Sequence, residues 1–522
     1  MNDHSGEHES LWMATEIVPH FPPLNEDTTA DVCIVGAGIA GISTAYMLSL
    51  EGKSVVVLDD GDIGSGETER TTSHLSNAFD DRYCEVARMH GEHAAQLIAD
   101  SHSTAIARIE ANAVKEKINC EFERLDGFLF VAPGESTAIL ERELEACHRA
   151  GLMDVEWVES APINSFNTGP CLRFPRQGQM HPTKYLHGLA QAFVRRGGRI
   201  YCGTHVAKIE SGDPGRVRTS SSRTVEASSV VVATNSPVND KVAIHTKQAP
   251  YRTYVIGARI PRDSVRRALY WDTLDPYHYV RLQRNNDAFG EEYDVLVVGG
   301  EDHKTGQLPE LGTPFANLEN WARHRFPMMQ DIEFRWSGQV MEPTDGLAFI
   351  GRNPGDTDNI YICTGDSGQG MTHGTIASIL LTDLIAGRPN EWSTVYDPSR
   401  VTMKSVGEFA RENLNVARKY GQWLLPGEVR TVDEIPPDSG AIIRRGMVKV
   451  AVYRSKNGEL YEKSATCPHL GCILQWNNIE KSWDCPCHGS RFEKFGAVVN
   501  GPSIHDMKAV KSHFEEEVPR EQ

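Results

Sequence analysis

Four cysteines and two histidines are crowded into one short segment near the end of the chain. They are Cys467, His469, Cys472, Cys485, Cys487 and His488. The outer members form a C-x-H motif and a C-x-x-H motif, and fifteen residues separate His469 from Cys485. Two thiolates and two imidazoles suit an asymmetric [2Fe–2S] cluster, in which two cysteines bind one iron and two histidines bind the other. The same four ligands could instead hold a structural zinc ion.

The order of these residues resembles that of Rieske proteins and differs from that of zinc ribbons. Cysteine and histidine are interleaved, a proline follows Cys467 and another follows Cys485, and two further cysteines are present. The resemblance implies a Rieske [2Fe–2S] cluster whose ligands are Cys467, His469, Cys485 and His488. It also implies a disulfide between Cys472 and Cys487, because a matching pair clamps the cluster loops in Rieske proteins of cytochrome bc complexes. Two free, buried thiols are the alternative.

Residues after the ligands bear on the reduction potential, which imidazole ligands raise towards roughly −150 to +300 mV. Ser490 matches a bc-type serine that hydrogen-bonds a cluster sulfide. Phe492 stands where those proteins have a tyrosine whose hydroxyl bonds a ligand sulfur. Since donors to sulfur stabilise the reduced cluster, we expect the missing hydroxyl to lower the potential. Residues 501–503 resemble the proline-containing loop that shields the cluster.

A second chemical motif lies near the start of the chain. Residues 30–35 form a strand-like apolar run that leads directly into the glycine motif GAGIAG at 36–41. A helical pattern follows, and a second strand-like run, 54–58, ends at Asp59. In such a unit the glycines allow a tight turn beside a pyrophosphate, and the acid accepts hydrogen bonds from ribose hydroxyls. The pattern predicts a dinucleotide-binding fold.

Much of the chain resembles the D-amino-acid oxidase-like flavoproteins, a group that includes sarcosine oxidases, glycine oxidase and gamma-glutamylputrescine oxidase. The similarity extends from about residue 25 to about residue 395 and rests on five segments in the family's order: 63–76, 181–210, 229–235, 345–351 and 360–372. Asn235 replaces a glycine of the family pattern. The resemblance implies FAD as cofactor. It also implies an α/β FAD-binding domain of the glutathione-reductase Rossmann type with an inserted, mainly antiparallel substrate sheet, followed by a small all-β Rieske domain.

The glycine motif and the resemblance together assign the residues that contact FAD. These are Gly36, Gly38, Ile39, Ala40, Gly41, Asp59, Asp60, Gly66, Thr68, Thr71, Thr72, His74, Val206, Ala233, Thr234, Gly365, Gly368, Gln369, Gly370, Met371 and Thr372. Some amine dehydrogenases of the family attach FAD through a histidine in the loop after the second strand. Arg70 occupies that place here, and His74 lies four residues further on. We therefore expect non-covalent FAD.

Candidates for the chemical step lie on the expected covering sheet and after the flavin loop. Strand-like runs that fit the sheet are 251–260, 277–282 and 293–298. The candidates expected to face the flavin are Tyr251, Arg252, Tyr254, Arg281 and His373. On a sheet, tyrosine and arginine are also common packing or surface residues. His303 is either a substrate or metal contact or a turn residue. Positioning and desolvation matter more than a strong base here, because a neutral amine can itself lose a hydride.

Composition limits the partners and the compartment. The chain has 522 residues and a formal net charge of −18, so nucleic acid and anionic membrane surfaces are unexpected partners. The first residues lack the basic and apolar regions of a secretory signal. The longest apolar stretch, 376–385, is too short to cross a membrane. We expect a cytoplasmic protein with no transmembrane segment, in which the scattered cysteines are reduced.

The length and the two motifs predict several domains. An FAD-dependent oxidoreductase domain is expected at 1–395, a helical linker at 396–425 and the Rieske domain at 426–522. The first domain is divided into FAD-binding segments at about 28–90, 170–245 and 335–395 and substrate segments at about 91–169 and 246–334.

Two redox cofactors in one chain indicate an electron path. We expect a dehydrogenase that oxidises an amine, an N-methylated amine or an amino acid at a C–N bond. Electrons would pass from FAD through the cluster to an external acceptor protein or quinone. One alternative is an NAD(P)H-dependent reductase feeding a partner oxygenase, although no second nucleotide motif is found; another is a redox-sensing or docking flavoprotein. We do not expect a Rieske oxygenase, because in that family a mononuclear iron domain follows the Rieske domain, and here 34 residues follow His488.

Overall fold

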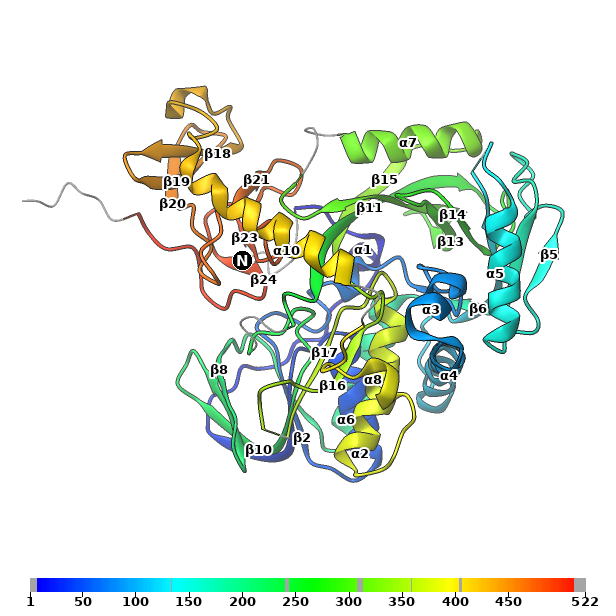
Figure 1. Ribbon diagram of the computed structural model, residues 1–522, viewed down its shortest axis with the longest axis horizontal. Helices are drawn as coiled ribbons and strands as arrows, with labels where there is room; N and C mark the ends of the chain where they lie inside the picture. The colour runs from blue at the N-terminus through cyan, green and yellow to red at the C-terminus, as the bar shows by residue number, and fades with distance from the viewer. Residues whose placement is uncertain are drawn as a thin grey trace, which may run out of the picture.

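The computed structural model describes residues 7–132, 134–239, 244–307, 313–357, 359–402 and 406–510. Two large sheets form the N-terminal unit, residues 7–402, and two small sheets form the C-terminal unit, residues 426–510 (Figure 1). Helix α10 (Val406–Tyr420) lies between the two units in the chain and crosses the front of the molecule in Figure 1. Within the described ranges, no helix combines the length and the apolar character needed to cross a membrane.

The first large sheet has the strand order β16-β17-β10-β1-β2-β7, and β8 and β9 extend it from β10. The strands are β1 (Thr28–Val35), β2 (Val55–Leu58), β7 (Arg199–Tyr201), β8 (Val206–Glu210), β9 (Gly215–Thr219), β10 (Thr224–Val232), β16 (Phe349–Arg352) and β17 (Ile360–Thr364). β1 pairs in parallel with both β2 and β10, so their carboxyl ends meet at one edge. A fully buried strand such as β2 is typical of a parallel sheet covered on both faces.

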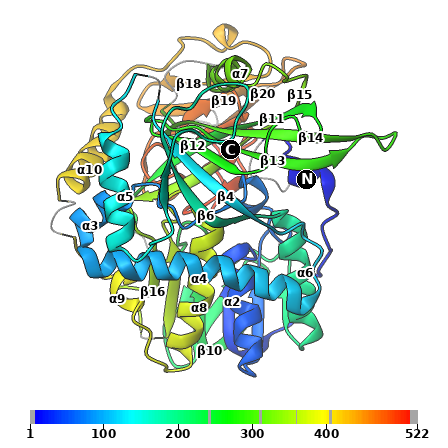
Figure 2. The ribbon, with the colours of Figure 1, turned by 90° about the vertical axis from the view of Figure 1, so that its right-hand side faces the viewer.

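Helices cover one face of this sheet. They are α2 (Ile39–Leu50), α4 (Glu92–Glu116), α6 (Pro182–Arg195) and α8 (Gly370–Ile385), all visible together in Figure 2. Side chains alternate along β1, so Ile34 packs under these helices whereas Cys33 packs with residues of β8 and β9 on the other face. The helices hold β1 and α2 in the geometry that the glycine motif requires.

The second large sheet has the order β15-β11-β14-β13-β12-β4-β6-β3, with β5 beside β6. Its strands are β3 (His74–Leu75), β4 (Glu123–Phe130), β5 (Glu156–Val158), β6 (Cys171–Gln179), β11 (Gln248–Pro261), β12 (Leu269–Asp272), β13 (Tyr279–Asn286), β14 (Glu292–Lys304) and β15 (Ile332–Pro343). Every strand pair is antiparallel except β4 with β12, so the expectation of a mainly antiparallel inserted sheet is confirmed. Helix α7 (Thr313–Arg325) packs on its outer face. This unit also contains α3 (Tyr83–His90), α5 (Ala138–Arg149) and α9 (Ser393–Tyr396).

The C-terminal unit consists of antiparallel strands, as expected of a small all-β domain. One sheet has the order β18-β19-β20 and the other β21-β22-β23-β24. The strands are β18 (Ser439–Arg445), β19 (Val448–Arg454), β20 (Leu460–Ser464), β21 (Gln475–Asn477), β22 (Ser482–Asp484), β23 (Arg491–Glu493) and β24 (Val498–Asn500). The cysteine and histidine motifs lie in the two loops that follow β20 and β22.

The N-terminal segment crosses the joint between the units, an arrangement that the sequence did not predict. It contains the short helix α1 (Leu11–Thr15), capped by the side chain of Ser10. Ser10 Oγ donates a hydrogen bond to the Glu69 carbonyl at 2.6 Å, and Trp12 Nε1 donates to the Thr71 carbonyl at 2.6 Å. The backbone N–H of Glu7 donates to Glu480 in the C-terminal unit at 3.1 Å. One segment therefore contacts both the loop after β2 and the C-terminal unit.

Candidate functional site

A cavity of about 1660 Å³ lies where the two large sheets and the C-terminal unit meet. Its wall includes the glycine motif after β1, the inner face of the second sheet and the loop 500–504 of the C-terminal unit. The volume exceeds the 300–1,000 Å³ or so of an ordinary small-molecule site, so it can hold a dinucleotide together with a substrate.

The glycine turn after β1 has the backbone shape that dinucleotide binding requires. Gly36 has a φ of +107°, and a Cβ there would lie 2.3 Å from the Ala233 carbonyl oxygen. Gly38 is the N-cap of helix α2 and offers no side chain; the Ile39 N–H donates to Thr68 Oγ1 at 3.1 Å, and the following N–H groups of the first turn remain for phosphate. Asp59 accepts hydrogen bonds from the backbone N–H groups of Ala37 and Gly61. Burial, followed by the nearby Asp60, raises the pKa of Asp59 to about 7.

The cavity wall contains all the residues expected to contact FAD except Gly41, Gly365 and Thr372. A Cβ at Gly41 would lie 1.9 Å from the Gly36 carbonyl oxygen, so this glycine permits the helix to pack on the turn. Gly365 is in the left-handed region and lies against Pro343, and Thr372 donates a hydrogen bond to the Gln369 carbonyl. These three residues shape the backbone of the site behind its wall. The close backbone packing at these glycines fits a bound dinucleotide.

Arg70 and His74 both line the cavity and are both held by the protein. Arg70 Nη1 donates to the Ser337 carbonyl at 3.3 Å. The His74 ring nitrogens lie 3.1 Å from Thr72 Oγ1 and 3.4 Å from the Val280 carbonyl. Burial, and then the charge of Arg281, lower the pKa of His74 to about 3, so its imidazole is neutral.

Two of the catalytic candidates line the cavity and two lie on the opposite face of the second sheet, whereas Arg281 shares the face of Tyr279 without lining the cavity. Tyr251 and His373 line the cavity, whereas Arg252, Tyr254 and Arg281 do not. Neighbouring residues of a strand point to opposite faces, so Tyr251 and Arg252 cannot both face the cavity. Arg252 and Tyr254 face the side that carries α7 and the C-terminal unit.

Arg281, His373 and His303 each contact other residues of the protein. Arg281 Nη1 donates to the backbone carbonyls of Thr72, Ser73 and Met180 at 3.0–3.1 Å and so fixes the loop before β3. His373 Nδ1 lies 2.8 Å from the Asp366 carbonyl, and burial lowers its pKa to about 4. His303 stacks on Tyr254, away from the cavity.

Sequence reasoning missed several residues that line the cavity on the second sheet. These are Thr253, Tyr277, Tyr279 and Asp302. Tyr279 Oη lies 2.7 Å from Thr253 Oγ1, and Tyr277 Oη donates to Asp80 at 2.9 Å. The signal was present, because Thr253 lies two residues from Tyr251 and Asp302 lies next to His303, so strand alternation could have found them.

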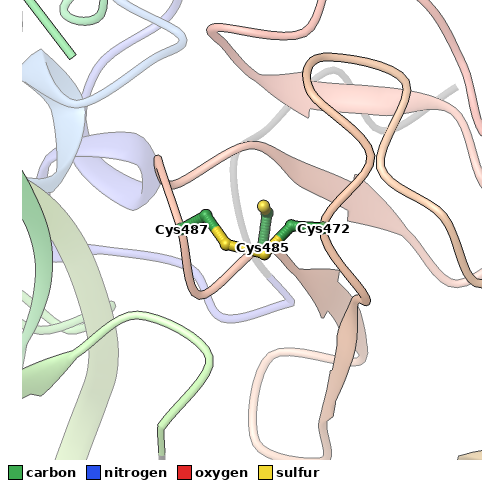
Figure 3. Close-up of side chains that lie close together, drawn as sticks. All are labelled: Cys472, Cys485 and Cys487. Carbon is green, nitrogen blue, oxygen red and sulfur yellow. A yellow bond between two sulfur atoms is a disulfide. The ribbon is translucent and has the colours of Figure 1, made fainter. Parts of the chain in front are cut away.

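The cysteine and histidine motifs meet at the tips of two loops. Cys472 and Cys487 form a disulfide with a Cα–Cα distance of 6.5 Å (Figure 3). The Cys485 sulfur lies within 4.8 Å of both disulfide sulfurs. Cys467 and Cys485 are free thiols in hydrogen-bonding contact, and the rings of His469 and His488 are 5.1 Å apart.

This donor set fits a [2Fe–2S] cluster. The disulfide uses Cys472 and Cys487, and the remaining side chains are two thiols and two imidazoles, as a Rieske cluster requires. Ser490 is fully buried next to these loops; its hydroxyl contacts Cys467 and accepts a hydrogen bond from the Ser503 backbone N–H at 3.0 Å. Phe492 is fully buried in the same apolar cluster as both free cysteines.

The cluster loops face the N-terminal unit. The ring of His245 lies 5.1 Å from that of His469 and 5.9 Å from that of His488. Gln339 on β15 donates a hydrogen bond through Nε2 to the Gly489 carbonyl at 3.0 Å. Gly489 is in the left-handed region, and a Cβ there would lie 2.6 Å from Pro250. The loops therefore pack directly against the sheet that walls the cavity.

Two family profiles match the chain. The profile described as DAO, FAD dependent oxidoreductase, matches residues 31–384, and the profile described as Rieske [2Fe-2S] domain matches residues 426–512. The chain is 30% identical over 504 residues to the putative Rieske 2Fe-2S iron-sulfur protein YhfW of Bacillus subtilis (strain 168), covering 96% of this chain and 97% of the relative.

Two further relatives match the N-terminal unit. Gamma-glutamylputrescine oxidoreductase of Escherichia coli (strain K12) is 29% identical over 401 residues, covering 73% of this chain and 90% of the relative. The crystal structure of glycine oxidase from Geobacillus kaustophilus aligns with a TM-score of 0.60 at 18% identity, covering 72% of this chain and 99% of that one. The second likeness concerns the fold alone.

Proposed function

The chain belongs to the FAD dependent oxidoreductase (DAO) family and carries a Rieske [2Fe–2S] domain, and from that premise we propose that it is an amine dehydrogenase with an internal electron carrier. It oxidises an amine, an N-methylated amine or an amino acid at a C–N bond. Electrons leave the flavin singly through the cluster and pass to an external acceptor protein or quinone. The domain limits inferred from the sequence, 1–395, 396–425 and 426–522, are part of this proposal.

The chain's own residues bind and position the reactants. FAD, when bound, takes two electrons and a hydrogen from the amine carbon, and a [2Fe–2S] cluster takes one electron at a time. The glycine turn and Asp59 hold the dinucleotide, and Cys467, His469, Cys485 and His488 hold the cluster. Tyr251 and His373 line the cavity, and the neutral His373 adds no positive charge beside an amine.

The observation that carries the electron path is the position of Gln339. This buried side chain lines the cavity, and its amide donates to the carbonyl of Gly489, the residue directly after the proposed ligand His488. The Gln339 backbone N–H donates to Glu67 at 2.6 Å, in the loop after β2 that contributes to the same wall. Gln339 thus joins the cavity wall to the cluster loop by hydrogen bonds. The C-terminal unit does not have to move for this contact to form.

Anaerobic rapid mixing of the holoprotein with amines tests the proposal. Flavin absorbance should fall first, and the cluster should then be reduced at a rate that does not depend on protein concentration. Replacement Gln339→Leu should slow the second phase and leave the first unchanged, whereas Gln330→Leu, at an exposed position, should change neither. Cluster reduction that speeds up with protein concentration contradicts transfer within the chain. Fast flavin reduction by NADH or NADPH supports a reductase instead.

A further inference from the structure

The wall of the cavity on the side of the second sheet is rich in carboxylates and tyrosines. We call this part the acidic pocket; its residues are Asp80, Asp81, Tyr251, Tyr277, Tyr279, Asp302, Glu342 and Asp366, and all of them line the cavity. Asp80 and Asp81 are exposed towards it, and the other carboxylates are half-buried. Arg82 lies beside Asp81 and offsets its charge, and Arg82 also donates to the Thr273 carbonyl at 3.3 Å.

Several acceptor atoms of the wall have no hydrogen-bond partner among the described residues. They are Asp302 Oδ1, Asp366 Oδ1 and Gln369 Oε1, each buried. Gln369 is only 9% exposed, and its amide nitrogen is already used, donating to the Ala78 carbonyl at 2.6 Å. Buried acceptors normally have a donor, because an unmatched one costs about 1–3 kcal/mol. Gln369 is also expected to contact FAD, whereas the two carboxylate oxygens suit a further ligand with N–H donors.

The carboxylates also repel one another. Burial raises the pKa of Asp366 to about 7 and that of Asp302 to about 6, and it raises the pKa of Glu342 well above its ordinary value, with Asp81 adding to the effect. A cation bound among them removes this electrostatic cost, because it favours the ionised form of each carboxyl group. The rings of Tyr277 and Tyr279, 5.4 Å apart, add aromatic faces that attract an ammonium group.

The same charges limit which nitrogen can occupy the pocket. An amine transfers a hydride to flavin only when its nitrogen is neutral, since the lone pair becomes part of the C=N bond. Neighbouring carboxylates raise the pKa of an ammonium group and so hold it protonated. The nitrogen held by the acidic pocket is therefore not the nitrogen that is oxidised.

Resting on the proposed function, we propose that the substrate is a diamine or polyamine, with one nitrogen oxidised at the flavin and a second, protonated nitrogen held by Asp80, Asp302 and the tyrosines of the acidic pocket. An α-amino acid fits this pocket poorly, because its carboxylate would meet like charge. The proposal fixes the substrate class for the site and leaves the electron path as stated above.

The first test compares three substrates of similar length with the holoprotein under anaerobic conditions. These are 1,4-diaminobutane, pentylamine and 4-aminobutyrate. The half-saturating concentration for flavin bleaching should be at least about tenfold lower for 1,4-diaminobutane, a difference of about 1.4 kcal/mol. Equal values for the diamine and the monoamine overturn the inference but leave an amine dehydrogenase. Bleaching by none of the three, nor by any other amine or amino acid, overturns the proposed function itself.

The second test removes one charge without changing the shape of the side chain. Asp302→Asn should raise the half-saturating concentration of 1,4-diaminobutane at least about tenfold and leave that of pentylamine nearly unchanged. Asp331→Asn, at an exposed position outside the cavity, should change neither. Asp80→Asn repeats the test if Asp302→Asn fails to fold, as judged by FAD content. Equal effects of the substitution on diamine and monoamine contradict the assigned role.

Discussion

Arg252 and Glu480 form an ion pair across the joint between the two units, with Nη2 and Oε1 4.0 Å apart and both side chains fully buried. Ser337 Oγ lies between them and is hydrogen-bonded to both. Burial opposes the ionised form of Glu480, but a hydrogen bond with His8, and then the charges of Arg252 and Arg70, hold its pKa well below the ordinary value. The C-terminal unit is thus fixed to β11 by charges that water does not reach.

Breaking this pair should destabilise the joint. Glu480→Gln leaves the buried Arg252 guanidinium without its partner and should cost up to about 3–5 kcal/mol, measured by thermal unfolding. Glu459→Gln, at an exposed position, should cost almost nothing. An apolar double variant, Arg252→Met with Glu480→Leu, should recover part of the loss, because the buried charge of Arg252 is removed together with that of its partner. Equal stability of Glu480→Gln and the parent protein would show that the pair is not closed in solution.

Purified protein should contain one FAD per chain that is released by denaturing precipitation. Both ring nitrogens of His74 lie near protein oxygen atoms, and Arg70 stands at the place of the anchoring histidine. The measurement is the flavin absorbance of the supernatant and the pellet. Flavin that stays in the pellet identifies a covalent bond, and His74→Ala would then have to release it.

The cluster should carry two iron and two acid-labile sulfide per chain and show the low-g, rhombic electron paramagnetic signal of a histidine-ligated reduced cluster. Substitution His488→Cys should shift or abolish that signal while FAD remains bound, since none of the four proposed cluster ligands lines the cavity. His505→Cys, outside the motif, is the matched control. Stoichiometric zinc without iron in the parent protein would end the electron-transfer account.

The reduction potential should respond to the donors around Cys467. Ser490→Ala removes a hydroxyl that contacts this sulfur, so the reduced cluster loses stabilisation and the potential should fall. Phe492→Tyr adds a hydroxyl within the same buried cluster and should raise the potential. A hydrogen bond to a charged group contributes at most about 1.5–3 kcal/mol, and a tenfold change is about 59 mV, so shifts of several tens of millivolts are expected. Unchanged potentials in both variants, with intact clusters, would show that the loop geometry differs.

Selectivity for a diamine should depend on pH. Asp302 and Asp366 have pKa values raised to about 6 and about 7, so both become ionised as pH rises through that range. The protonated second nitrogen of the diamine prefers the ionised carboxylates, and the ratio of half-saturating concentrations, pentylamine over 1,4-diaminobutane, should grow between about pH 5.5 and about pH 8. Both substrates must lose a proton from the reacting nitrogen, and taking the ratio of their half-saturating concentrations corrects for this shared effect of pH. In Asp302→Asn the ratio should be smaller and its rise with pH weaker.

Asp302 and Asp366 should affect stability in the opposite sense: a rise in pH increases the selectivity for a diamine but lowers the free energy of unfolding. A carboxyl group whose pKa is raised by folding holds more protons in the native state than in the unfolded state between about pH 4 and about pH 7. The free energy of unfolding therefore falls as pH rises through this window, and a bound diamine should restore part of it.

Local patterns were sufficient for the cofactor motifs. The spacing of Cys467, His469, Cys485 and His488 and the glycine turn at Gly36 are set by short stretches of chain, and the structure brings each set together. The face of a strand residue is also local information, yet Arg252 and Tyr251 were both expected at the flavin although neighbours on a strand point to opposite faces. The alternation of side chains along residues 251–254 is enough to place Arg252 and Tyr254 on the other face from Tyr251.

Contacts between segments far apart in the chain could not be predicted from local sequence patterns. Glu480 reads as an ordinary surface acid in a turn, and only the docking of the C-terminal unit on β11 buries it against Arg252. The acidic pocket combines Asp80, Asp302 and Asp366 from three separate segments, and their closeness follows from how the two large sheets face each other. No periodicity within one segment encodes that arrangement.

The contacts of the N-terminal segment form in a fixed order during synthesis of the chain. Glu7 and its partner Glu480 are 473 positions apart, whereas Ser10 and Trp12 bind residues 69–71. On the ribosome the early partners meet soon after synthesis begins, and domains fold as they emerge. The bond to Glu480 forms only when nearly the whole chain has left the tunnel. The contacts of His245 with His469 and His488, and of Gln339 with Gly489, also need residues 469–489, so the joint over the cluster loops closes equally late.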